Sequence, residues 1–184
     1  MTSKLKTDVL ETGSGSGTIT LNNQLSGMTA ASMPSGSVLQ VLSKSVTDTS
    51  STTSTSFVAL STLNQAITPI ATSSKVLVSF SMQLEMSTHA AGYLQINRTV
   101  GGVDTPIDVV TRGGVSASRM FLSQGYGGAN GQSTSLEFLD SPNTTSAITY
   151  SVKWSVGSGT AYFNSGVTSA IPASSSITLM EIKG

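Results

Sequence analysis

The chain has 184 residues, no net charge, only 10% charged residues and no cysteine. This length accommodates one domain with an appendage, and the lack of cysteine excludes disulfides, thiolate metal sites and thiol nucleophiles. No Lys or Arg cluster is long enough to follow a phosphate backbone, and no window of about 18 residues is continuously apolar, which argues against nucleic-acid binding and membrane insertion. The first residues carry no apolar signal segment, so we expect synthesis in the cytoplasm without a signal peptide.

Residues 1–36 differ in character from the rest of the chain. They contain a Gly-Ser tract at 13–17 and end at Pro34-Ser-Gly36. Their apolar residues are too few to offset the entropy of ordering the segment alone. We therefore predict an extended N-terminal anchoring arm that is held in place by sister subunits or by a larger assembly, with contacts made by Leu5, Val9, Leu10, Ile19 and Leu21.

Residues 37–184 show the alternation of apolar and polar side chains that is typical of strands buried on one face. The clearest run is 148–156, where every even position is large and apolar. No segment has an apolar stripe at helical spacing. Clusters of Gly, Pro, Asn and Ser separate ten expected strands: 38–46, 57–60, 76–86, 93–99, 107–111, 120–123, 135–139, 148–156, 161–164 and 177–182.

These strands predict an all-β fold, a jelly-roll-like antiparallel β-sandwich. The tract 47–56, which is nearly all Ser and Thr, is expected to form a polar edge of the sandwich or a solvated loop.

Several stretches of the chain resemble one protein family. They are SKLKTDVLETGSGSGTITLNN (3–23), PSGSVLQV (34–41), SSTTSTSFVAL (50–60), ITPIATSSKVLVSFSM (67–82), LDSPNTTSAITYSVKW (139–154) and SSITLMEI (175–182). In this order they resemble β-rich structural proteins of tailed bacteriophages that are described as tail fibres, especially those of marine and cyanobacterial phages. The chain lacks the coiled-coil heptads and repeated shaft of a long fibre.

The resemblance implies a non-enzymatic virion protein that forms a homotrimer. We interpret the chain as a short appendage, of the fibre or capsid-decoration type, that binds other capsid or tail proteins through its arm. The alternative is a receptor-binding fibre tip whose loops near Tyr93, Tyr126 and Tyr162 bind host surface glycans. The resemblance transfers no catalytic residue and implies no cofactor.

Few residues offer chemistry beyond assembly. His89 is the only histidine, which is too few ligands for Zn²⁺ even with Glu85 nearby. Asp104 and Asp108 flank Thr-Pro-Ile and would give Ca²⁺ two of the six to eight oxygens it takes, so a solvated turn is the simpler interpretation. The same applies to Glu137 and Asp140, which could be paired carboxylates or charges solvated at a strand end.

Aromatic residues give two further predictions. Trp154 lies on the large-residue side of its strand, which favours a core position over a sugar-stacking platform. The Gly-rich segment 123–132 contains one aromatic residue and several amides, a composition that adapts to glycan or protein surfaces. Its candidate contact residues are Tyr126, Asn130 and Gln132, and a plain surface loop is the alternative.

Overall fold

The computed structural model describes residues 29–88, 90–107, 109–112, 115–117, 119–122, 131–165 and 173–184. The chain divides into two units, Met1–Met33 and Pro34–Gly184. The described end of the first unit is a 3-10 turn, η1 (Ala30–Ser32), in which the Ser32 N–H donates to the Thr29 carbonyl at 2.9 Å. Residues 1–28 lie outside the described part, so the anchoring arm and its boundary after residue 36 stay predictions.

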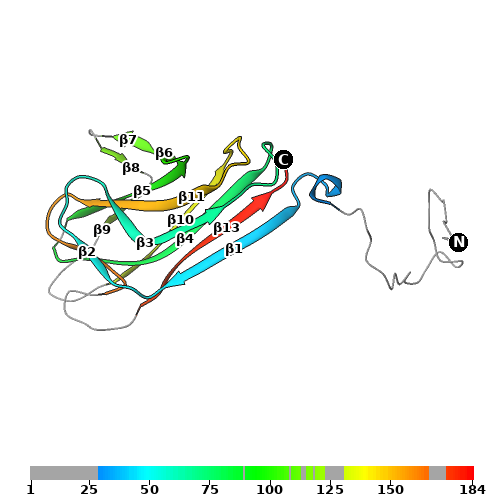
Figure 1. The fold of residues 1–184 in the computed structure, drawn as a ribbon. Coiled ribbons are helices and arrows are strands. Elements are labelled where there is room, and N and C mark those ends of the chain that lie inside the picture. The colour runs from blue at the N-terminus through cyan, green and yellow to red at the C-terminus, as the bar shows by residue number, and fades with distance from the viewer. Residues whose placement is uncertain are drawn as a thin grey trace, which may run out of the picture. The chain divides into compact units, whose positions relative to one another are not determined.

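All other regular structure in the described residues is β-strand (Figure 1). No helix in this part of the chain is long and apolar enough to cross a membrane. The strands are β1 (Val38–Val46), β2 (Ser50–Thr52), β3 (Val58–Ile67), β4 (Lys75–Met86), β5 (Ala91–Val100), β6 (Val103–Ile107), β7 (Val110–Arg112), β8 (Val115–Ala117), β9 (Arg119–Leu122), β10 (Gln132–Asp140), β11 (Ile148–Val156), β12 (Ala161–Phe163) and β13 (Ser175–Ile182).

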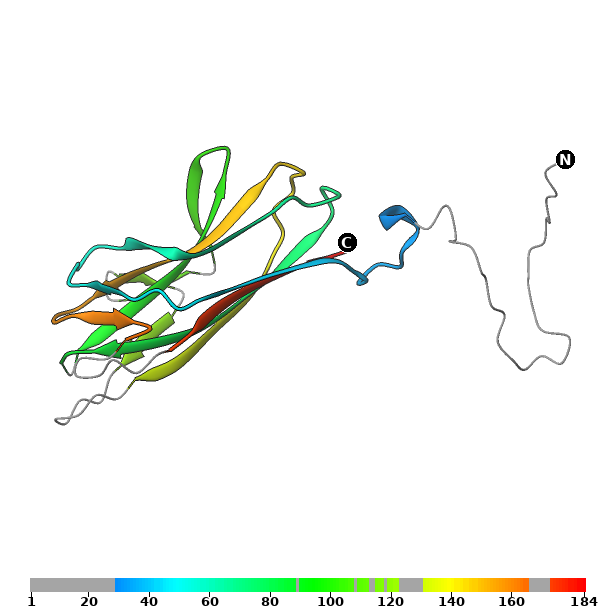
Figure 2. The ribbon, with the colours of Figure 1, turned by 60° about the horizontal axis from the view of Figure 1, so that its bottom comes forward.

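Two antiparallel sheets form the sandwich of the second unit, and Figure 2 shows them as two layers. β7 and β8 pair with each other as a separate two-stranded sheet. In the first sheet β1, β13, β4 and β10 are neighbours in that order. The long β4 pairs along one edge with β13 and, further on, with β12, which in turn pairs with β2. In the second sheet β11 lies between β3 and β5, and the other edge of β5 pairs with β6 and β9.

The strand order identifies a jelly roll. The first sheet contains the order β1-β13-β4-β10 and the second the order β3-β11-β5-β9. Strands from the first half of the chain thus pair with strands from the second half in a nested series, β1 with β13, β3 with β11, β4 with β10 and β5 with β9. This double Greek-key arrangement is the jelly-roll fold. The predicted all-β jelly-roll sandwich is therefore confirmed.

Alternation along each strand builds the core between the sheets. On β4 the even-numbered side chains from Val76 to Met86 are at most 3% exposed, and on β11 those from Ile148 to Val156 are at most 1% exposed. Trp154 is 1% exposed and is the largest of these side chains, so the prediction of a core tryptophan is confirmed. The bounds predicted for β1 and β11 match the structure residue for residue.

β3 is longer than the predicted segment 57–60 because its alternation is interrupted. Its pairing with β11 shifts between Ser151 and Lys153, where β3 holds extra residues. The buried residues of β3, Leu60, Leu63 and Ile67, are therefore three and four positions apart instead of two. A bulge of this kind hides the period that sequence analysis relies on.

The prediction of one strand at 107–111 was wrong. The chain instead makes a tight turn at Gly101 and Gly102, whose φ values are 56° and 82°, and returns as β6 beside β5. Two consecutive positive φ values are what a type I′ hairpin requires, and glycine provides them without steric cost. Pro106 is tolerated in β6 because the strand lies on the sheet edge. β2, within the Ser/Thr-rich tract, confirms the expected polar edge.

Candidate functional site

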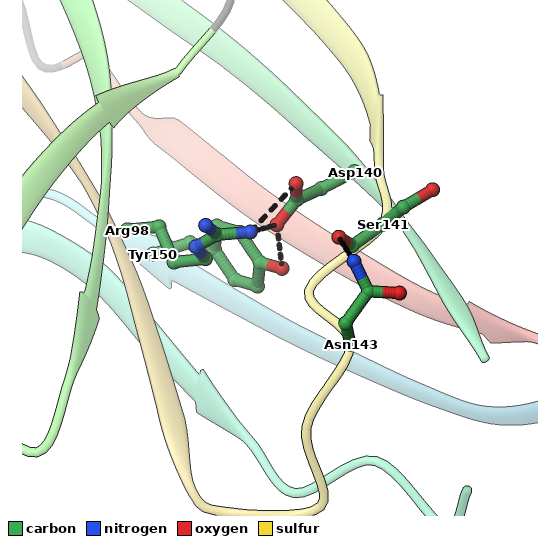
Figure 3. A network of polar contacts seen from close by, with 5 residues as sticks. All are labelled: Arg98, Asp140, Ser141, Asn143 and Tyr150. Atoms are coloured by element: carbon green, nitrogen blue, oxygen red, sulfur yellow. Dashed lines mark hydrogen bonds and ion pairs between the residues drawn. The ribbon is translucent and has the colours of Figure 1, made fainter. Parts of the chain in front are cut away.

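The most concentrated polar cluster joins Arg98, Asp140 and Tyr150 (Figure 3). Arg98 Nη1 lies 2.9 Å from both carboxylate oxygens of Asp140, and the Tyr150 hydroxyl donates to Asp140 Oδ2 at 2.7 Å. Arg98 comes from β5, Tyr150 from β11 and Asp140 from the end of β10. The cluster thus links the two sheets of the sandwich by charge-assisted hydrogen bonds.

Burial determines how this cluster behaves chemically. Asp140 is 5% exposed and Tyr150 is fully buried. Burial, reinforced by the hydrogen bond to the Asp140 carboxylate and by its charge, raises the pKa of the Tyr150 phenol well above its usual range. The phenol therefore stays protonated and donates a fixed hydrogen bond. The cluster thus holds the Tyr150 phenol as a hydrogen-bond donor to Asp140 between the two sheets.

Glu137 does not join Asp140, although both belong to β10. Side chains three positions apart on one strand point to opposite faces. Glu137 is exposed on the outer face and accepts a hydrogen bond from Ser79 Oγ at 3.3 Å, while Asp140 points inward. The paired-carboxylate interpretation is therefore wrong. Solvation at a strand end is also wrong for Asp140: it is the last residue of β10, but its carboxylate is buried and bonded to Arg98 and Tyr150.

A second cluster surrounds Asp104 on the outer face of the second sheet. Lys153 Nζ lies 2.5 Å from Asp104 Oδ2, Asn97 Nδ2 donates to the same oxygen at 2.8 Å, and Thr99 Oγ1 donates to Oδ1 at 3.1 Å. Burial raises the pKa of Asp104, but the hydrogen bonds from Lys153, Thr99 and Asn97 and the charge of Lys153 outweigh it and hold the pKa below its usual value. The carboxylate is thus ionised and already neutralised by an ammonium group.

The turn expected around Asp104 is absent, because Asp104 lies in β6. A calcium ion there would compete with Lys153, and Asp108 lies outside the described residues. In the part of the chain that the structure describes, no group of three or more His, Cys, Asp or Glu side chains could hold a metal ion. His89 also lies outside it.

Asn164 forms a buried junction that sequence reasoning missed. Its backbone N–H donates to the Gln83 carbonyl at 3.0 Å, and Nδ2 donates to the carbonyls of Val46 and Asp48 at 3.0 and 3.2 Å. Ser175 Oγ donates to Asn164 Oδ1 at 2.6 Å and accepts the Gln83 N–H at 3.0 Å. The N–H and carbonyl of Gln83 in β4 thus find partners in the gap between the end of the β13 pairing and the start of the β12 pairing. Asn164 has a φ of 54°, a left-handed conformation that Asn tolerates better than most residues.

Glu181 is a further buried acid without a sequence signal. It points into the sandwich from β13 and has no exposed surface. Its Oε2 accepts a hydrogen bond from Gln40 Nε2 at 2.5 Å, and its Oε1 accepts the backbone N–H of Ile70 at 2.7 Å. Because Gln40 lies on β1 and Ile70 in the connection between β3 and β4, Glu181 fixes that connection against the sheet.

The predicted contact residues fall mostly outside the described part of the chain. Tyr126 and Asn130 lie outside it, as do the arm residues Leu5, Val9, Leu10, Ile19 and Leu21. Gln132 begins β10 opposite Leu84 and is half-buried, so it is a strand residue. Tyr93 and Tyr162 are half-buried strand residues of β5 and β12.

Comparisons with known proteins find no matching family model and no matching curated protein. Among solved structures, the chain is similar to the infectious bursal disease virus Gx strain, with a TM-score of 0.36, 12% identity, and coverage of 80% of this chain and 39% of that one. It is similar to the VP2 subviral particle of the same virus, with a TM-score of 0.36, 12% identity, and coverage of 79% and 38%. The chain thus spans about two-fifths of those structures' length.

Proposed function

We propose that the chain is a structural protein of a bacteriophage virion, a short trimeric appendage of the fibre or capsid-decoration type. The observation that carries the proposal is the jelly-roll strand order, because this fold is common in viral capsid and lectin domains. A fold alone does not establish a function. Support also comes from the clusters around Asp140, Asp104 and Asn164, in which hydrogen bonds join strands of the sandwich to one another.

The proposed mechanism is assembly. The sandwich presents a surface rich in Ser and Thr hydroxyls, which keeps it soluble with only 10% charged residues. The segment 1–36 anchors the trimer to the capsid or tail, with Leu5, Val9, Leu10, Ile19 and Leu21 buried against the virion partner.

Light scattering on the full-length chain tests this assembly. A trimer gives about three times the chain mass of 18.8 kDa. A chain lacking residues 1–36 should keep the same β-type circular dichroism spectrum but should no longer attach to particles. A full-length protein that is monomeric at high micromolar concentration would refute the trimer.

The second candidate is a receptor-binding tip that engages host glycans. The jelly roll is also a lectin fold. The segment 123–131 between β9 and β10 contains Tyr126 and Asn130, and Gln132 follows it as the first residue of β10. A glycan array separates the two functions. A purely structural appendage gives no hits, whereas a receptor-binding tip binds a defined glycan, and the variant Tyr126→Ala no longer binds that glycan.

A further inference from the structure

The outer face of the first sheet carries an apolar row that crosses four strands in register. Leu139 of β10 pairs with Leu77 of β4, Leu77 with Met180 of β13, and Met180 with Val41 of β1. Leu139 is 45% exposed and Val41 52% exposed, while Leu77 and Met180 are half-buried. The row therefore runs across the face from β10 to the edge strand β1 and is open to solvent at both ends.

The rows beyond it on one side are almost entirely hydroxyl. The next row is Glu137, Ser79, Thr178 and Ser43, and the one after it is Ser135, Ser81, Ser176 and Ser45. Bonds within the rows, such as the 3.0 Å contact between Ser43 Oγ and Thr178 Oγ1, already use several of these hydroxyls. Apart from Glu137, this part of the face therefore presents only hydroxyls.

On the other side of the apolar row lie Lys75, Ile182 and Val38, again in register. Lys75 and Glu137 are the exposed charged residues that the four strands place on this face, counting only described residues. They have opposite signs and lie on opposite sides of the apolar row, on the neighbouring strands β4 and β10. This arrangement is complementary to itself under a two-fold rotation.

We infer that this face binds the same face of a second copy of the chain, about a two-fold axis parallel to the apolar row. Such an axis places the apolar row against its own copy, with Leu77 facing the partner's Leu77. It also places the partner's Lys75 directly opposite Ser79 of β4, across the gap of about 10 Å between stacked sheets. Glu137 lies on the next strand, about 4.8 Å from Ser79, so the side chain of the partner's Lys75 can reach it. Two symmetric ion pairs then flank a continuous apolar contact, as isologous interfaces require.

The size of the face sets the expected strength. Four strands at about 4.8 Å spacing and about nine residues at 3.4 Å give on the order of 600 Å² per copy. The total of roughly 1,200 Å² lies at the lower end for specific protein interfaces. We therefore expect a concentration-dependent contact with a dissociation constant on the order of micromolar. The interface is independent of the proposed trimer. A chain that makes both contacts forms a closed hexamer if the two-fold axis crosses the three-fold axis, and a larger open assembly if it does not.

Light scattering and sedimentation across a concentration series test the contact in the full-length protein. The variant Val41→Asp/Leu139→Asp should weaken it at least tenfold, while the control Val103→Asp, at a 68% exposed position on β6, should not change it. Glu137→Lys and Lys75→Glu should each weaken it several-fold, and the two together should restore it. Two results would overturn the inference, even if the protein is a trimer. In the first, the Val41/Leu139 double variant has the same mass at every concentration as the wild type. In the second, the combined Glu137→Lys/Lys75→Glu exchange does not restore the contact.

Carbodiimide coupling of a mixture of ¹⁴N- and ¹⁵N-labelled chains shows which residues lie against this face of the first sheet, and whether they belong to a second copy of the chain. The inference predicts a peptide link from Glu137 to Lys75 that joins differently labelled chains. Within one chain the link is out of reach, because the two residues are four positions apart along paired strands, about 14 Å. Links from Glu137 to Lys4 or Lys6 instead would mean that the N-terminal segment covers this face, and would refute the second copy as its partner.

Discussion

The buried Asp140 carboxylate should contribute strongly to stability, and its removal is the sharpest test of the core as described. Asp140→Ala leaves the fully buried Tyr150 hydroxyl without an acceptor, which costs about 1–3 kcal/mol. It also removes the ion pair to Arg98, whose side chain is 24% exposed and keeps access to water. The loss is therefore smaller than the roughly 3–5 kcal/mol for a fully buried pair, and we expect about 2–4 kcal/mol in total.

A double-mutant cycle separates the two contributions. Tyr150→Phe alone should cost about 1–2 kcal/mol, because it removes one hydrogen bond to a charged group. In the Asp140→Ala background the same change should cost nothing or should recover up to about 1–3 kcal/mol, because it removes a buried hydroxyl that has lost its acceptor. The difference is a coupling energy of at least about 1–2 kcal/mol. Asp140→Asn is the matched control for charge, because it keeps an acceptor for Tyr150.

Urea unfolding measures these free energies through the fluorescence of Trp154, the single tryptophan, which is 1% exposed in the folded protein. Glu137→Ala, on the exposed face of the same strand, should change stability by no more than about 0.5 kcal/mol. A cost below about 1 kcal/mol for Asp140→Ala, or single costs that simply add in the double variant, would refute the buried cluster.

Four further predictions follow from the same structure. Trp154→Ala should cost about 3–5 kcal/mol in thermal or urea unfolding, and an unchanged melting temperature together with lost ligand binding would show a surface platform instead. Folding raises the pKa of Tyr150, so the stability that its protonated phenol contributes is complete below about pH 10 and declines above it. Between neutral pH and pH 11, the free energy of unfolding of the wild type should fall by about 1.4 kcal/mol more than that of Tyr150→Phe. Parallel curves of unfolding free energy against pH for the two proteins would contradict this. Asn164→Ala should cost about 2–4 kcal/mol by unsatisfying the buried carbonyl of Val46 and the side chain of Ser175, whereas a cost near zero would mean that water replaces the amide. Residues 37–184 should fold alone with a melting temperature close to that of the full chain, and a disordered spectrum would show that the arm is part of the fold.

Strict alternation explains why some strands could be predicted to the residue. β11 buries every second position from Ile148 to Val156, so the period of two fixed its bounds. β1 alternates between exposed and less exposed positions from Gln40 to Val46, after an irregularity between Val38 and Gln40. β6 offered no such signal: its first four residues are exposed, and it is held by the Gly101–Gly102 turn and its pairing with β5. In β3 the bulge changed the spacing of the buried residues and hid most of the strand.

The polar clusters could not be predicted because their partners are distant in sequence. Arg98 and Asp140 are 42 residues apart, and Asn164 and Val46 are 118 apart. A single carboxylate or amide in the sequence looks the same whether it faces water or a buried partner. The Gly-Gly pair between two valines at 100–103 was a readable hairpin signal, and it would have placed Asp104 in a strand.

The central claim, that the chain is a virion structural protein, is tested most directly by quantifying it in purified particles. Virions from the host culture that carries this gene are purified on a density gradient, washed at high salt, and analysed by quantitative mass spectrometry against the major capsid protein. The account predicts that the chain copurifies at a constant ratio, in a multiple of three copies per particle. Recovery of the chain only in the particle-free fractions of the lysate would contradict it.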